Sequence, residues 1–353
     1  MNMLTELVDH VIGVDPDRDR VTAAVIDSRT QGELARAEFA ANPAGYRALV
    51  EWADDHSTGD GRVWSIEGTG SYGAGLAATL SDAGEWVVEF DRPATRAARD
   101  GAKSDGLDAV RAARELLGRD KWAQPRARGI REAMRVLLVA RSGAQRSRVA
   151  TINQLKGLLV TAPTELREEL RGLTTGHLIK RCAAFRPAGR DETAMTKTSL
   201  RILARRIRAL DAEITDVDRE LKSLVVEVAP QLLDEYGVGP VCAAQVYVSW
   251  SHPGRCRNEA SFARLAGVAP IEATSGQTQN RHRLNRGGDR RLNRALHTIV
   301  TVRIRYDAET RAYIDAAIAR GKTKRDATRC LKRYVGRRLY RLLENPPEPL
   351  DAL

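Results

Sequence analysis

Short apolar runs alternate with polar connectors over the first 120 residues of the chain. The runs at Val11–Val14 and Val21–Ile26 flank a polar segment at 15–20, and two β-branched runs with such a connector predict a β-hairpin. Further strands are predicted at Ala35–Ala40, Val63–Ile66 and Trp86–Phe90, and helices at Pro43–Trp52, Ser71–Leu80 and Ala109–Leu117. Three strands that pair early, followed by strand–helix alternation, indicate an α/β domain built on a mixed sheet.

The middle of the chain has a helical period instead. Residues 130–159 predict a basic helix, and beyond Pro163 an apolar seam alternates spacings of three and four residues. The seam consists of Leu200, Leu203, Ile207, Leu210, Ile214, Val217, Leu221 and Leu224. It predicts a coiled-coil arm whose simplest partner is a second copy of the chain. The alternative is a helical hairpin formed with residues 130–159 of the same chain.

The last third of the chain is mainly helical and rich in arginine. The glycines of residues 236–240 fit either a helix–hairpin–helix turn, whose amides approach a DNA phosphate, or an ordinary turn between helices. Asp289 is the only acid between Arg281 and Arg305. The side chains expected to contact nucleic acid there are Arg281, Arg283, Arg286, Arg290, Arg291 and Arg294.

These patterns divide the chain into four parts. Residues 1–125 form the α/β domain, 126–228 the helical coiled-coil linker and dimerisation region, 229–345 a mainly helical C-terminal domain, and 346–353 a tail. The expected fold class is therefore α/β plus all-α.

Composition narrows the class of partner. The chain has 57 Lys and Arg against 46 Asp and Glu, a net charge of +11, which favours a polyanion. Aromatic residues make up only 5% of the chain, which argues against binding that relies on base stacking. The four cysteines are scattered, so neither a zinc site nor a disulfide framework is predicted. No signal peptide or membrane span is visible, and we expect a cytoplasmic protein.

Four carboxylates carry the candidate chemistry. Asp15 and Glu67 each end an apolar strand, while Asp105 and Asp108 are three residues apart and share one face of a helix. Together the four could hold two Mg²⁺ ions on a phosphodiester, with Mn²⁺ as a possible substitute. Each acid taken alone has an ordinary explanation as a turn former, a solvated loop acid or a helix cap. Their joint pattern favours the metal site.

A serine supplies a candidate nucleophile. Ser275 lies in a Thr-Ser-Gly turn that leads into the arginine-dense segment, where guanidinium groups could stabilise charge developing on a phosphate. No histidine base is obvious, and a serine before glycine is usually just a loop residue.

These residues together carry a resemblance to a known family. The segments Val11–Asp15, Ser65–Glu67, Lys103–Ala109, Thr274–Gly276 and Gly288–Leu296 are similar to the transposases of the IS-one-ten insertion-sequence family. The resemblance spans nearly the whole chain. It implies a ribonuclease H or RuvC-like domain with an Asp-Glu-Asp-Asp set, a coiled-coil linker and a C-terminal transposase domain with a serine before glycine.

The resemblance also implies a mechanism and partners. Asp15, Glu67, Asp105 and Asp108 would bind Mg²⁺, and Ser275 would be the nucleophile of a DNA recombinase. A non-coding bridge RNA would pair with donor and target DNA. The protein would act as a synaptic multimer, a dimer or tetramer, in which acids of one subunit and serine of another form a composite site.

Two rival functions remain open at this point. A RuvC-like nuclease would hydrolyse branched DNA with water and would need only the acids. A non-catalytic nucleic-acid-binding scaffold would need neither the acids nor the serine. A sugar kinase or actin-like ATPase shares a similar first strand, but its phosphate loops are not evident and the arginine-rich C-terminus would go unexplained.

Overall fold

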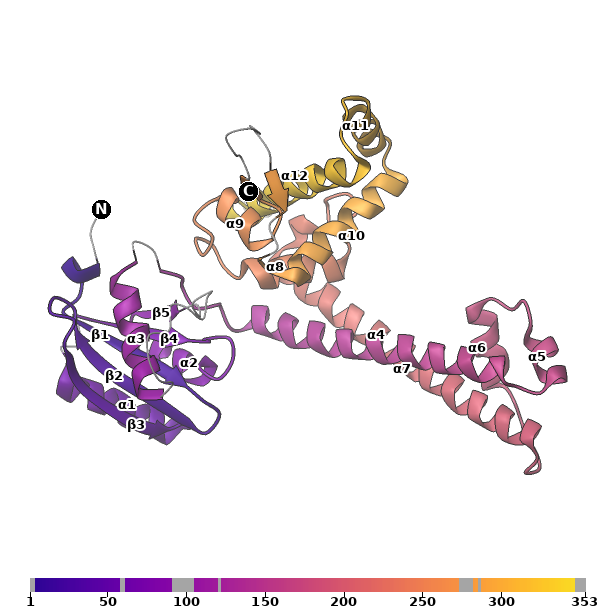
Figure 1. Ribbon diagram of the computed structural model, residues 1–353, viewed down its shortest axis with the longest axis horizontal. Helices are drawn as coiled ribbons and strands as arrows, with labels where there is room; N and C mark the ends of the chain where they lie inside the picture. The colour runs from indigo at the N-terminus through magenta and orange to yellow at the C-terminus, as the bar shows by residue number, and fades with distance from the viewer. Residues whose placement is uncertain are drawn as a thin grey trace, which may run out of the picture. The chain divides into compact units, whose positions relative to one another are not determined.

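The computed structural model describes residues 4–57, 61–90, 105–119, 122–272, 282–284 and 287–346. The side chains of 105, 106, 272 and 282–284 lie outside that description. The chain forms two compact units, Met1–Ala127 and Arg128–Leu353 (Figure 1). Each is described by itself below.

A five-stranded mixed sheet forms the centre of the first unit. Its strands are ordered β3 (Glu33–Ala40), β2 (Arg20–Asp27), β1 (His10–Pro16), β4 (Arg62–Glu67) and β5 (Val87–Phe90). The first three strands along the chain pair antiparallel, whereas β1, β4 and β5 pair parallel. The mixed sheet predicted from the sequence is confirmed.

Helices cover both faces of this sheet. Ile12 and Val14 of β1 pack in one cluster with α1 (Pro43–His56) and α2 (Ala74–Asp82). Val11 packs on the other face, beneath α3 (Asp105–Leu117), which crosses the strands in Figure 1. Because side chains alternate across a strand, one short apolar run can fill both layers, which explains why residues Val11–Val14 of β1 include no polar side chain.

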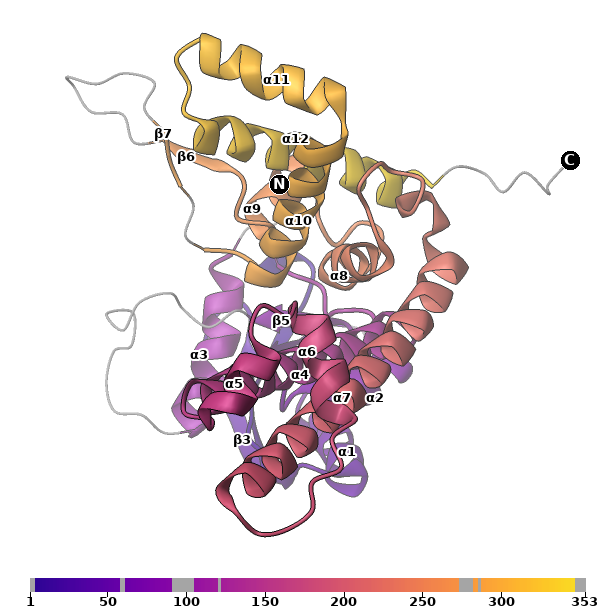
Figure 2. The same ribbon diagram turned by 90° about the vertical axis from the view of Figure 1, so that its right-hand side faces the viewer.

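A helical hairpin, which we call the arm, begins the second unit. The two long helices α4 (Ile130–Val160) and α7 (Glu192–Val228) lie side by side (Figures 1 and 2). Arg141 pairs with Asp218 and Arg148 with Asp211, so the helices run antiparallel. At the tip, α5 (Thr164–Leu170) and α6 (Thr175–Ala183) enclose an apolar cluster that includes Leu155, Cys182 and Ile207.

The apolar seam of α7 packs within the chain. Leu200 and Ile207 are buried in the cluster at the tip, and Leu221 is buried at the opposite end of the arm, which we call its base. Leu210 and Ile214, which lie between them, are half-buried. This is the intramolecular hairpin that the sequence left open as the alternative to a dimer seam. The heptad pattern alone could not choose, because it specifies an apolar stripe and not the helix that covers it.

The rest of the second unit is a helical bundle on the base of the arm. It contains the helices α8 (Pro240–Trp250), α9 (Glu259–Leu265), α10 (Arg290–Tyr306), α11 (Ala308–Ala319) and α12 (Lys324–Glu344), a short 3-10 turn η3 (Pro230–Leu232) and the strands β6 (Pro270–Glu272) and β7 (His282–Leu284). Met134 of α4, Val225 of α7, Leu296 of α10 and Leu339 of α12 share one buried cluster. The base of the arm and the bundle therefore have a common core.

No helix within the described residues is long and apolar enough to cross a membrane. The four cysteines are free, and burial raises the pKa of Cys182 to about 11. The sequence-based expectation of no disulfide agrees with this.

Candidate functional site

Asp15 and Glu67 lie at the same end of the sheet. The parallel register between β1 and β4 pairs Val14 with Ile66, and each acid directly follows its member of that pair. Neighbouring strands are about 5 Å apart, so the register itself holds the two carboxylates next to each other. Both residues are half-buried.

The alternation of side chains puts both acids on one face. Along β1, Val11 packs beneath α3 and Gly13 contacts it, whereas Ile12 and Val14 face α1 and α2. Along β4, Ser65 Oγ donates to the carbonyl of Ala112 in α3, at 2.9 Å. Asp15 lies two residues after Gly13, and Glu67 lies two residues after Ser65, so both belong to the face that α3 covers.

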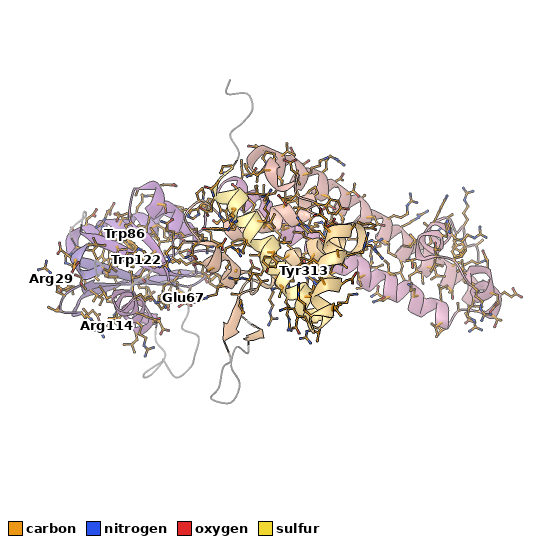
Figure 3. All side chains as sticks on the ribbon, turned by 90° about the horizontal axis from the view of Figure 1, so that it is seen from above. Arg29, Glu67, Trp86, Arg114, Trp122 and Tyr313 are labelled. Atoms are coloured by element: carbon orange, nitrogen blue, oxygen red, sulfur yellow. The ribbon has the colours of Figure 1, made fainter. Side chains whose placement is uncertain are left out.

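The helix α3 runs antiparallel to β1. Its Arg114 donates to the carbonyl of Gln31, at 3.1 and 3.2 Å, and Gln31 follows the end of β2 that pairs with His10. The opposite end of α3, which carries Asp105 and Asp108, therefore points toward Asp15 and Glu67. Figure 3 shows Glu67 away from Arg29, which lies at the His10 end of the sheet beside Asp9.

We call Asp15, Glu67 and Asp108 the acid edge. Asp108 is bound by Arg111, whose Nη1 lies 2.9 Å from Asp108 Oδ1. Among the described side chains, no group of three or more histidine, cysteine, aspartate or glutamate residues could hold a metal ion. The three acids thus share one end of the unit without forming one ligand group, and the Asp105 side chain lies outside the description. Their oxygen donors are of the type that Mg²⁺ prefers.

Two further residues near Glu67 were not found by sequence reasoning. Thr69 Oγ1 is buried and lacks a hydrogen-bond partner within the described part of the chain. A Cβ added to Gly70 would lie 2.8 Å from Arg126 Nη1, so this guanidinium lies against the turn that follows β4. A buried hydroxyl and a guanidinium therefore lie at the turn that follows Glu67, and neither Thr69 nor Arg126 belongs to a sequence motif that would have revealed it.

Ser275 lies outside the described residues, which resume at 282. The strands on either side are described: β6 and β7 pair antiparallel, with Glu272 opposite His282. Figure 2 shows both strands beside α9 and α12. The residues 273–281 that connect them include the predicted nucleophile.

A basic pocket lies at the base of β6. It has a volume of ≈ 470 Å³, and its lining includes Pro270, the basic residues Lys322, Arg329, Lys332 and Arg333, and one acid, Asp326, which pairs with Arg329. Lys332 Nζ donates to Asn293 Oδ1 at 2.6 Å, and Asn293 Nδ2 donates to the carbonyl of Ala266 at 2.7 Å. Burial, with a smaller contribution from Arg329, lowers the pKa of Lys332. The two hydrogen bonds of Asn293 link α12, through α10, to the segment that leads into β6.

The Gly288-Asp289 pair has a structural role. Gly288 has φ +94°, and an added Cβ would lie 2.5 Å from the carbonyl oxygen of Leu265. Asp289 caps α10: its Oδ1 accepts from the amides of Arg291 and Leu292, at 2.7 and 3.1 Å, and its Oδ2 accepts from Ser249 Oγ at 2.6 Å. These contacts fix where α10 begins and therefore where its first arginines lie.

The predicted nucleic-acid contacts divide into two groups. Arg290, Arg291 and Arg294 are exposed on the first turns of α10. Arg281 and Arg286 lie outside the described residues, as does the side chain of Arg283 in β7.

The glycine turn before α8 packs on α10. Gly237 has φ +78°, and Arg303 Nε donates to the carbonyl of Tyr236 at 2.7 Å. Arg303 also pairs with Glu235, at 3.2 Å. These contacts favour an ordinary turn between helices over a phosphate-binding one.

Two family models match the chain. The model described as the transposase IS116/IS110/IS902 family matches residues 229–315, and the DEDD transposase model of IS110 matches residues 12–162. Both the acid edge and the first turns of α10 fall inside matched segments.

Two curated proteins are similar over part of their length. The uncharacterized 42 kDa protein of insertion element IS900 from Mycobacterium paratuberculosis is 33% identical over 136 residues, which cover 37% of this chain and 34% of that protein. The uncharacterized 43.6 kDa protein of insertion element IS110 from Streptomyces coelicolor is 31% identical over 148 residues, covering 39% and 36%. The chain thus matches about a third of the length of these relatives.

Proposed function

Because the chain belongs to the IS110 (IS-one-ten) transposase family, we propose that it cuts and rejoins DNA as the transposase of an insertion element. One observation carries the proposal: Asp15 and Glu67 follow a registered pair on neighbouring parallel strands and share the face covered by α3. A register-fixed carboxylate pair is suited to phosphodiester chemistry, which needs charge held at a defined spacing.

We assign Asp15, Glu67, Asp105 and Asp108 to a site for Mg²⁺ or Mn²⁺. The bound cation would neutralise charge on the phosphate that is being cut. Asp108 now pairs with Arg111, so it would exchange that guanidinium for the cation. The register of β1 and β4 already sets the spacing of Asp15 and Glu67.

Ser275 is the proposed nucleophile. Its Oγ forms a bond to phosphorus, the phosphorus–oxygen bond to the leaving deoxyribose breaks, and the leaving oxygen takes up a proton while the serine proton passes to a base. The covalent phosphoserine retains the phosphodiester bond energy. Attack by a second DNA hydroxyl then releases the serine, so rejoining needs no nucleotide cofactor.

The proposed partners are donor DNA, target DNA and a non-coding bridge RNA that pairs with both. RNA pairing would supply sequence choice, while the basic chain would hold phosphates. We further propose a homo-oligomer, a dimer or a tetramer in the synaptic complex. The arm leaves apolar side chains exposed along α4, among them Val136, Val139 and Val149, which another subunit could cover.

The test is a strand-transfer assay with labelled donor and target DNA, Mg²⁺ and protein purified with RNA transcribed from the flanking element. Wild type should give a protein–DNA adduct and joined product on a denaturing gel. Ser275→Ala should lose both, whereas Ser261→Ala, an exchange at a partly exposed serine of α9, should keep them.

Other outcomes identify the rival functions. Cleavage that survives Ser275→Ala without an adduct would replace the serine mechanism with metal-dependent hydrolysis by water. Binding without cleavage in wild type, unchanged by Asp15→Asn, would indicate a scaffold.

A further inference from the structure

An arginine-lined groove runs between the arm and the bundle of the second unit. Its deeper part has a volume of ≈ 530 Å³ and lies between α4, α8 and α10. A second hollow of ≈ 450 Å³ continues it along α4 as far as Asn153. The two share Ser142, Gln145 and Arg146 of α4 and Arg294 of α10. We call the two together the arginine groove.

The groove combines residues that are distant in sequence. Arg141 and Arg146 come from the arm, and Arg290, Arg291 and Arg294 come from α10, about 150 positions later. Neither wall contributes an aspartate or glutamate to the lining. The long-range packing of α4 against the bundle therefore concentrates cations that the sequence presents as two separate segments.

Within the described part of the chain, four of these five arginines have no carboxylate partner. Arg141 is neutralised by Asp218. In contrast, Arg290, Arg291 and Arg294 have no carboxylate partner within the described residues, and Arg146 donates only to Ser142 Oγ, at 3.0 Å.

Other arginines of the same unit are paired. Arg303 and Arg338 share Glu235, and Arg337 and Arg341 share Glu259. A concentration of unpaired like charges costs free energy in the folded state, because each guanidinium repels the others. An anion in the groove would remove that repulsion.

The shape and lining indicate which anion. From Leu138 to Asn153 the α4 wall is about 22 Å long at 1.5 Å per residue, so a single small anion would leave most of the groove empty. Planar guanidinium forks suit phosphate oxygens. Gln145, Gln245 and Asn153 add neutral hydrogen-bonding groups, and the lining contains no aromatic ring on which a base could stack. These features match a sugar–phosphate backbone and not exposed bases.

The arginines of α10 stand on a fixed support. Asp289 anchors the start of the helix through Ser249, and Gln245 Nε2 in turn donates to Ser249 Oγ at 3.0 Å. Leu292 and Leu296 are buried in the core on the opposite side of α10. The helix therefore presents Arg290 and Arg294 at defined positions while the side chains remain exposed.

We propose that the arginine groove binds the sugar–phosphate backbone of one nucleic-acid strand, with Arg146 of the arm and Arg290, Arg291 and Arg294 of α10 as its phosphate contacts. This inference rests on the proposed function, which identifies the polyanion as nucleic acid. RNA and DNA offer the same backbone chemistry, so the experiment distinguishes them.

The test measures binding of the full chain to labelled single-stranded RNA, single-stranded DNA and duplex DNA by fluorescence anisotropy at several salt concentrations. The groove variant is Arg146→Gln/Arg290→Gln/Arg294→Gln. The control is Arg205→Gln/Arg206→Gln/Arg208→Gln, which removes the same charge from exposed positions of α7. Circular dichroism melting of both variants checks that they fold alike.

The groove variant should reduce the slope of log K against log[salt] by about 2 on a single strand or about 2.7 on a duplex, at roughly 0.7 and 0.9 per phosphate contact. The control should change it far less. The ligand with the largest loss is the natural occupant, and equal losses identify general backbone binding.

Equal slope losses in the two variants, or a wild-type slope in the groove variant, would refute the proposal that the groove binds the nucleic-acid backbone. If wild-type protein binds none of the three ligands, the proposed function itself fails. Retained binding and strand transfer in the groove variant would instead reject only the groove.

Discussion

The acid edge and the arginine groove hold their charges in different ways. Asp15 and Glu67 are half-buried, and the register of β1 and β4 sets their spacing. Arg146, Arg290 and Arg294 are exposed on long helices. Fixed carboxylates suit a reaction that requires defined geometry, whereas exposed cations suit a long polyanion held by charge. Substitutions at the acid edge should therefore change the rate of DNA cleavage, and substitutions in the arginine groove should change the affinity for nucleic acid.

The largest effect is expected at the acid edge. Asp15→Asn keeps the shape of the side chain but removes its charge, so DNA cleavage should fall by roughly 10³-fold, or about 4 kcal/mol of barrier. DNA affinity at fixed salt should change little. Single-turnover cleavage and anisotropy on the same samples separate the two quantities. Asp19→Asn, an exposed acid of the β1–β2 connection, serves as the matched control. A loss of affinity as large as the loss of rate would erase the contrast between the two regions.

The contact of Gly13 with α3 gives the next largest effect. A Cβ on Gly13 would lie 2.0 Å from the carbonyl oxygen of Ala109 and 2.8 Å from the amide nitrogen of Ala113. Gly13→Ala should therefore push α3 off the sheet and destabilise the first unit by about 3 kcal/mol. Calorimetry of the full chain measures this. Gly143→Ala in α4 meets no atom within 4 Å and should stabilise its helix by up to about 1 kcal/mol. Equal effects at both sites would contradict the packing described.

A smaller effect is expected at the support of the arginine groove. Asp289→Ala removes the acceptor for the backbone amides of Arg291 and Leu292 and for the hydroxyl of Ser249 on α8, which should cost about 2 kcal/mol of unfolding free energy. Asp307, the N-cap of α11, also accepts from two backbone amides and one hydroxyl, but all of these belong to Glu309 and Thr310 of its own helix. The same change there breaks no bond to another helix and should cost about 1 kcal/mol. Urea titrations compare the two. A larger loss at Asp307 would show that the Ser249 bond adds nothing.

The smallest effect concerns Lys332. Because burial lowers its pKa below 10.5, the folded protein binds this proton less tightly than the unfolded chain does. The free energy of unfolding should therefore rise with pH between the lowered pKa and 10.5 and then level off. Lys332→Met should remove that rise, whereas Lys324→Met at an exposed position should keep it. Urea midpoints from pH 8 to 10.5 measure it, and parallel curves for wild type and Lys332→Met would reject this account.

Local patterns predicted most of the first unit. Alternating β-branched runs located all five strands, and each observed strand lies within two residues of its predicted start. The acids at the ends of β1 and β4 were found for the same reason, because an apolar run that stops at a carboxylate marks the edge of a sheet.

Long-range packing was not predictable in the same way. The sequence left open whether α4 or a second copy of the chain would cover the seam of α7, and it did not indicate that Arg146 would meet α10. It also missed buried Arg62, which pairs with Glu85 and, at 2.7 Å, with Asp54. Each of these contacts depends on how the elements pack in three dimensions, which the local sequence pattern around a residue does not determine.

Divalent-cation binding tests the central claim most directly, because it does not depend on turnover, RNA or DNA. Mn²⁺ titrations of the full chain, followed by electron paramagnetic resonance, would compare wild type with Asp15→Asn/Glu67→Gln. Glu33→Gln/Glu38→Gln on β3, two acids that pair with Arg36 and Arg20, is the control. We predict that wild type and the control bind Mn²⁺ and that the Asp15/Glu67 variant does not. Undiminished Mn²⁺ binding by that variant would contradict a metal site at the acid edge.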